Sequence, residues 1–96
     1  MRIDFSRHFK TFDGKDTTET MADVIAQALF NHGNAKPVSA DTKYQAYRLS
    51  QQILRNPTAV HILTEDATLI KEVCSEVLTA GGYGQVYETI ENPQND

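Results

Sequence analysis

The sequence contains no tryptophan, only three histidines and a single cysteine, Cys74. One cysteine cannot form an internal disulfide, whereas small secreted domains usually depend on several. No apolar run approaches the roughly 20 residues of a membrane-spanning helix, and the first residues lack the apolar core of a signal peptide. We therefore expect a protein of a reducing cytoplasm that makes no membrane contact.

The side chains that usually carry catalysis or bind metals are few and scattered. His8, His32 and His61 do not have the i, i+4 spacing that places two ligands on one helix face. Cys74 lies among aliphatic residues, which is typical of a buried thiol rather than a reactive nucleophile. The sequence thus predicts a protein that is not an enzyme, with no catalytic residues, no metal site and no bound cofactor.

Two short stretches resemble reactive motifs and are better explained by helix ends. Gly81 and Gly82 could belong to a phosphate-binding loop, but such loops follow a strand, whereas these glycines follow a predicted helix. We interpret them as a helix stop and turn. Glu65 and Asp66 could form an acid–base pair, but adjacent carboxylates in a first helical turn point in different directions. We interpret them as partners of the helix dipole.

The composition is that of one small globular domain: 96 residues, 40% of them hydrophobic and 23% charged. We place this domain at residues 1–91 and predict that the polar residues 92–96 form a flexible C-terminal tail. The predicted fold class is α+β, mostly helical, with three to four helices packed on a small β-sheet or hairpin.

The first two helices are predicted from caps and from apolar residues at helical spacing. One begins after Thr20 and is stopped by Gly33, and the next covers residues 40–55 behind the cap Ser39. The apolar stripe of the second helix contains Ala46, Tyr47, Leu49, Ile53 and Leu54.

The third helix is predicted to begin after Thr64 as its cap and to end at Gly81 and Gly82, and a short fourth helix covers residues 84–91. We expect inward-facing positions at Leu69, Ile70, Val73, Cys74, Val77 and Leu78 in the third helix and at Val86, Tyr87 and Ile90 in the fourth.

Strands are predicted where apolar and polar residues alternate. Residues 2–6 and 59–63 are the only segments apolar enough to pair centrally, so we expect them to share a small sheet, with His61 pointing outward. Within residues 2–18 we expect a β-hairpin or a strand and loop, since Asp13-Gly14 favours a tight turn.

The charge is unevenly distributed, although the net charge is only −4. Residues 36–57 carry net positive charge. The C-terminal part is acidic, and there a single lysine, Lys71, stands against Glu65, Asp66, Glu72, Glu76, Glu88, Glu91 and Asp96. Such an imbalance either keeps a protein soluble or attracts a basic partner.

The basic second helix leaves nucleic-acid binding open as an alternative function. Lys43, Arg48 and Arg55 share this helix with Tyr44 and Tyr47, and aromatic residues interleaved with cations can engage nucleic acid. Two observations argue against it: the net charge is negative, and the preceding loop is longer than that of a helix-turn-helix.

The order of motifs along nearly the whole chain resembles a group of small bacteriophage- and prophage-encoded proteins whose role is not established. The motifs that carry the resemblance are Ile3-Asp4-Phe5, Phe12-Asp13-Gly14-Lys15, Tyr47-Arg48-Leu49, Leu63-Thr64-Glu65-Asp66, Leu69-Ile70-Lys71 and Gly84-Gln85-Val86-Tyr87-Glu88. Gly81-Gly82-Tyr83 departs from the bulkier, proline-containing stretch of that group. The resemblance implies a phage accessory protein in a bacterial host cytoplasm, and it supplies no functional residue.

Our leading hypothesis is therefore a non-enzymatic protein–protein interaction module of phage or prophage origin. Tyr83 and Tyr87 are the candidate protein contacts, one turn apart if the last helix begins early, and a core-capping role for both remains open. The partner is an unknown protein. A homodimer is also open, through an edge strand at 15–18 or the apolar fringe of the second helix.

Overall fold

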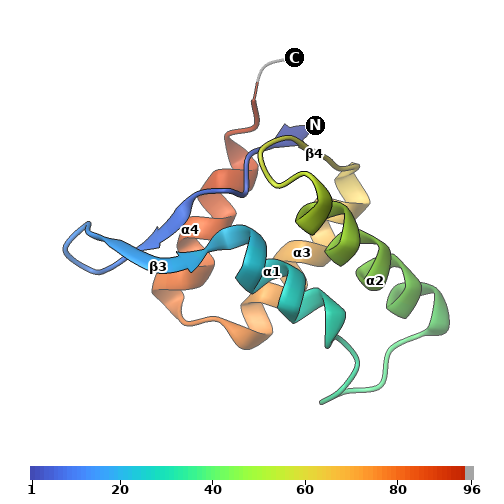
Figure 1. The fold of residues 1–96 in the computed structure, drawn as a ribbon. Helices are drawn as coiled ribbons and strands as arrows, with labels where there is room; N and C mark the ends of the chain where they lie inside the picture. Colours follow the sequence, from blue (N-terminus) through green and yellow to red (C-terminus); the bar gives the residue numbers. More distant parts are fainter. Residues whose placement is uncertain (95–96) are drawn as a thin grey trace.

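The computed structural model describes residues 1–94 and confirms the α+β fold class (Figure 1). Within these residues four helices pack with two small antiparallel sheets of two strands each. The elements in chain order are β1 (Arg2–Ile3), β2 (His8–Lys10), β3 (Asp16–Thr20), α1 (Met21–Phe30), α2 (Ala40–Arg55), β4 (Val60–His61), α3 (Thr64–Val77) and α4 (Ala80–Glu91).

The pairing of the two distant apolar segments is confirmed, although both strands are shorter than predicted. β1 and β4 are antiparallel, with Arg2 opposite His61 and Ile3 opposite Val60. Beyond Ile3 the chain leaves this pairing because the backbone N–H of Phe5 donates to the carbonyl of Pro57 at 2.8 Å.

A β-hairpin follows as a separate sheet. β2 pairs with β3 through a turn in which the N–H of Gly14 donates to the carbonyl of Thr11 at 2.9 Å, and Gly14 has a φ of +85°. The hairpin projects from one side of the molecule, and α2 lies at the opposite side (Figure 1). The side-chain amide of Gln85 joins the hairpin to α4 by bonding both backbone groups of Lys10.

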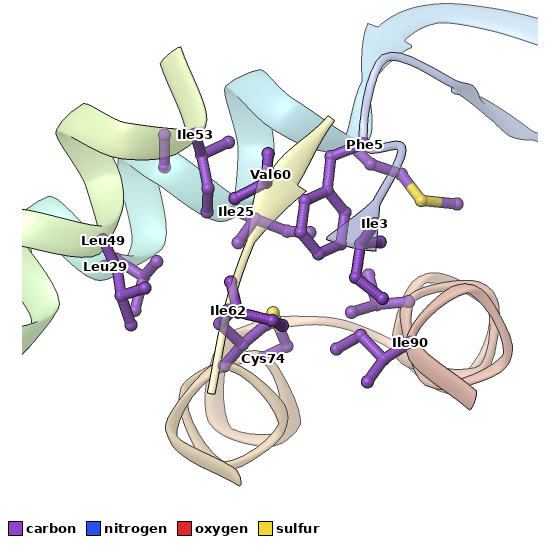
Figure 2. Packing of buried hydrophobic residues seen from close by; sticks show 14 of the residues in the cluster. Ile3, Phe5, Ile25, Leu29, Leu49, Ile53, Val60, Ile62, Cys74 and Ile90 are labelled. Atoms are coloured by element: carbon purple, nitrogen blue, oxygen red, sulfur yellow. The ribbon is translucent and has the colours of Figure 1, made fainter. Parts of the chain in front are cut away.

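Residues near both ends of the described chain contribute to one hydrophobic core. Figure 2 shows Ile3 and Phe5 beside Val60, with Ile25 of α1 and Ile90 of α4 pointing toward the same interior. The side chain of Phe5 is fully buried. Burial of this many aliphatic side chains is the main favourable contribution to folding.

The first two helices begin at the predicted caps, and α2 has the predicted bounds, whereas α1 ends at Phe30 with Asn31 as its C-cap, before the predicted stop at Gly33. The hydroxyl of Thr20 accepts from the N–H of Asp23 at 3.2 Å, and the hydroxyl of Ser39 accepts from the N–H of Thr42 at 3.1 Å. Tyr47 and Leu54, however, do not lie on the buried stripe of α2. Half of each side chain is exposed, because the buried face centres on Leu49.

Both predicted boundaries of the third helix differ from the structure. Thr64 is the first residue of α3 rather than its cap, and the carboxylate of Asp66 bonds the N–H of the capping residue, Leu63, at 2.9 Å. The helix ends at Val77, which is exposed instead of inward-facing, because the chain turns there to an extended Leu78.

The interpretation of Gly81 and Gly82 as a helix stop is wrong. Thr79 caps a new helix by accepting from the N–H of Gly82 at 3.4 Å, and α4 therefore begins at Ala80 instead of at residue 84. Val86 and Ile90 face inward as predicted, whereas Tyr87 lies at the edge of the helix and is 42% exposed.

The tail predicted at 92–96 is described as far as residue 94. There the N–H of Gln94 donates to the carbonyl of Arg2 at 2.8 Å, which ties the segment after α4 to β1. Residues 95 and 96 lie outside the described residues. In residues 1–94, no helix has both the length and the apolar character that crossing a membrane requires.

The glycine in the interior of α4 leads to a prediction on stability. A Cβ atom at Gly84 would have no neighbour within 4 Å, so we expect Gly84→Ala to raise the free energy of unfolding by about 0.5–1 kcal/mol through its helix propensity. Urea denaturation measures the change. Gly33→Ala is the contrasting variant, and we expect it to lower the free energy of unfolding. Gly33 has a φ of +96°, and an added Cβ would lie 3.1 Å from the side chain of Val38. Destabilisation by Gly84→Ala would contradict the placement of this residue.

Candidate interaction surface

Large exposed apolar side chains lie at the end of α1 and along the exposed side of α2. Phe30, Tyr44, Tyr47 and Leu54 are each at least half exposed. We call these four residues the aromatic ridge. They lie at the outside because the opposite face of α2 buries Leu49 and the residues around it against the core.

The rings of the aromatic ridge form a connected group rather than scattered surface residues. The centroid of Tyr47 is 6.1 Å from that of Phe30 and 6.4 Å from that of Tyr44, and both pairs are tilted. These separations lie in the range in which aromatic rings attract one another. Contiguous apolar surface of this kind marks interaction sites more often than single exposed residues do.

The three cations predicted as nucleic-acid contacts do not act as one group. Arg48 forms an ion pair with the carboxylate of Asp66 at 3.1 Å and donates to the side chain of Gln52 at 3.2 Å. Lys43 and Arg55 are exposed, but they stand near opposite ends of α2, about 18 Å apart along the helix axis. The structure therefore leaves two separated cations and one whose charge is offset.

Asp66, for which the sequence predicted only a role as a partner of the helix dipole, also makes buried contacts to α2. Only 2% of it is exposed, and its carboxylate accepts from the backbone of Leu63 and from the side chains of Gln45 and Arg48. Burial opposes ionisation, but these hydrogen bonds and the Arg48 charge together lower the pKa of Asp66 below its usual value. The position of Asp66 in the first turn of a helix indicated its local bond to the backbone of Leu63. Its contacts to α2 join residues distant in the sequence, so no local pattern predicts them.

Tyr83 and Tyr87 are brought together as predicted for an early start of the last helix. Their ring centroids are 6.1 Å apart, and the Nζ atom of Lys71 lies 4.3 Å from the centroid of Tyr87. Lys71 also pairs with Glu91 at 2.7 Å. Because Tyr83 packs against the core and Tyr87 is covered on one side by Lys71, this pair offers less free apolar surface than the aromatic ridge.

The cysteine and histidine side chains that could bind a metal or react do not form a cluster within residues 1–94. Cys74 is buried, and burial raises the pKa of its thiol to about 11. His61 is exposed, as predicted from its strand position. Within residues 1–94 no three histidine, cysteine or acidic side chains are placed to hold a metal ion.

A groove with a volume of about 1330 Å³ lies between the hairpin and the junction of α3 with α4. Its apolar floor includes Phe9, Met21 and Leu78. The ionisable residues around it are Arg7, His8, Lys10, Asp16, Glu19 and Glu88, and all of them are exposed. Lys10 pairs with Asp16 across the hairpin, and its hydrogen bond and charge lower the pKa of that carboxyl below its usual value.

No family model, curated protein or solved structure matches this chain.

The buried carboxylate predicts a pH dependence of stability. Since the pKa of Asp66 is lower in the folded state, its contribution is present above about pH 4, the unfolded value, and is lost as the pH falls through the folded pKa. We expect Asp66→Asn to lower the free energy of unfolding at pH 7 by about 1–3 kcal/mol, and the difference from wild type to shrink below pH 4. Urea denaturation at a series of pH values measures both. Glu65→Gln, at the exposed neighbouring position, is the control, and an equal loss there would contradict the role of Asp66.

The burial of Cys74 predicts a protected thiol. At pH 8 we expect an aromatic disulfide reagent to label the folded protein only as fast as the protein unfolds, and to label it fully in urea, because the thiol is inaccessible and protonated. Absorbance of the released thiolate reports the rate. Val77→Cys adds a thiol at an exposed position of the same helix and serves as the reactive reference. Labelling of Cys74 as fast as this reference would show that the core is open.

Proposed function

We propose that the protein is a non-enzymatic protein–protein interaction module of a bacteriophage or prophage, and that the aromatic ridge is its contact surface. The observation that carries this proposal is the connected exposure of Phe30, Tyr44 and Tyr47, together with the exposure of Leu54 further along α2. The resemblance to small phage- and prophage-encoded proteins supports the biological setting in a bacterial host.

The composition of the aromatic ridge suits protein recognition. Tyrosine and arginine are enriched among the residues that dominate binding energy at interfaces, and aromatic side chains bury large areas at low entropic cost. Tyr47 lies between Phe30 and Tyr44, and Arg48 follows Tyr47 on α2 and is held by Asp66. A side chain that is already held in place loses less conformational freedom on binding.

Binding of nucleic acid, the alternative function, is less well supported by the same surface. A backbone-tracking site needs several cations spaced along a groove, and each must be free to meet a phosphate. Arg48 is paired with Asp66, and Lys43 and Arg55 are too far apart to act on adjacent phosphates. Protein binding through the aromatic side chains is therefore the function that the geometry favours.

Photo-crosslinking in a bacterial cell that carries the gene tests the proposal. We expect a photoreactive phenylalanine analogue in place of Tyr47 to give a discrete adduct with a protein chain. Phe12 is the matched control position, since it is a fully exposed aromatic residue at the tip of the hairpin, on the other side of the molecule (Figure 1). Tyr44→Ala combined with Leu54→Ala should reduce the Tyr47 adduct severalfold. The absence of any adduct at position 47, or equal adducts at positions 12 and 47, would refute the proposal.

A further inference from the structure

The exposed residues of α2 have the spacing of a helix–helix seam. Tyr44, Tyr47, Gln51 and Leu54 follow one another at intervals of three, four and three residues. Intervals that alternate between three and four residues place the side chains in one row along the helix. Two helices that pack against each other in a coiled coil use the same spacing. Gln51, at the middle of the seam, is half-buried, and its neighbours within the seam, Tyr47 and Leu54, are exposed.

Charged residues flank this seam at intervals of one heptad. Asp41, Arg48 and Arg55 are seven residues apart, so they lie in line along the same side of the seam. Asp41 is at the first turn of α2 and Arg55 is at its last residue. The flank is therefore negative at one end and positive at the other.

We propose that the aromatic ridge binds the aromatic ridge of a second copy of this chain, with the two α2 helices antiparallel about a two-fold axis that passes close to Arg48. This inference rests on the proposed function, because it names the occupant of the same surface. In this arrangement Tyr44 lies opposite Leu54 of the second copy, and Tyr47 lies opposite Gln51 of the second copy. A polar residue in such a seam fixes its register.

Charge complementarity selects the antiparallel direction. Asp41 of each copy meets Arg55 of the other, so two ion pairs form at the two ends of the seam. The two Arg48 side chains meet near the axis, but each is already paired with Asp66 of its own chain at 3.1 Å. In a parallel arrangement Asp41 of one copy would lie at the opposite end of the seam from Arg55 of the other, so neither ion pair would form.

The edge strand, which the sequence offered as another route to a homodimer, is less suited to pairing. Both backbone groups of Glu19 in β3 are bonded to the hydroxyl of Thr17, at 3.3 and 3.4 Å. On the other strand of the hairpin, the backbone groups of Lys10 are bonded to Gln85. Side chains of the same chain thus already occupy part of both edges, and such protection is typical of edges that do not pair.

Sedimentation equilibrium of the full chain over a range of concentrations tests the proposal. We expect wild type to show a concentration-dependent dimer, and we expect Arg55→Asp to raise the dimer dissociation constant roughly tenfold or more, because two attractions become two repulsions. Combining Asp41→Arg with Arg55→Asp should restore the wild-type value. An equimolar mixture of the single variants Arg55→Asp and Asp41→Arg should also restore the wild-type dissociation constant. In the mixed dimer, residue 41 of each copy meets a residue 55 of opposite charge. Both positions are exposed, and circular dichroism checks that the variants remain folded.

The outcomes separate this inference from the proposed function. A monomer at every concentration, or a dimer that Arg55→Asp leaves unchanged or the double variant fails to restore, would overturn the antiparallel dimer. If Tyr47 then still crosslinks to a different protein, the proposed function stands without it. Loss of the larger species on nuclease treatment would show that nucleic acid holds the copies together, and would overturn the dimer as well.

Discussion

The hydrogen bonding of the N-terminal segment holds the rest of the structure in place. The N–H of Phe5 donates to the carbonyl of Pro57, and the carbonyl of Phe5 accepts from the N–H of Ala22, both at 2.8 Å. One residue thus joins the link after α2 to the beginning of α1. Since Ile3 and Phe5 are also buried, the segment fills the space between the helices while its backbone remains satisfied. The mutual positions of α1, α2 and β4 follow from this arrangement.

The core built around this segment uses few aromatic residues. Phe5 and Phe9 are buried, and the remaining contribution comes from aliphatic side chains and small residues (Figure 2). Aliphatic residues fill a small interior without polar atoms to satisfy, whereas a buried tyrosine needs a partner for its hydroxyl. The tyrosines are accordingly placed at the surface or at the edge of the core. Exposure of Tyr44 and Tyr47 is therefore a consequence of how the core is filled, and their contact with Phe30 makes that exposure contiguous.

Local signals explain which parts of the fold could be predicted from the sequence. Thr20 and Ser39 cap their helices through residues only three positions away, so the starts of α1 and α2 could be predicted from the sequence. The start of α4 was not, because the glycines at its beginning disfavour a helix by themselves. Packing of Val86 and Ile90 against the core outweighs that preference. The aromatic ridge was predicted only in part: its tyrosines were recognised on a helix, but Tyr47 and Leu54 were assigned to the apolar stripe and are exposed in the structure.

The link between Asp66 and Arg48 connects the core to the aromatic ridge. Because Asp66 offsets the charge of Arg48, the flank of α2 is left with Asp41 at its beginning and Arg55 at its end. An acidic residue in the first turn and a basic residue in the last both interact favourably with the helix dipole, so this distribution stabilises α2 within a single chain. When a second α2 helix lies antiparallel to the first, Asp41 of each helix lies next to Arg55 of the other. Electrostatic preference for an antiparallel neighbour therefore arises from charges that the isolated helix already favours.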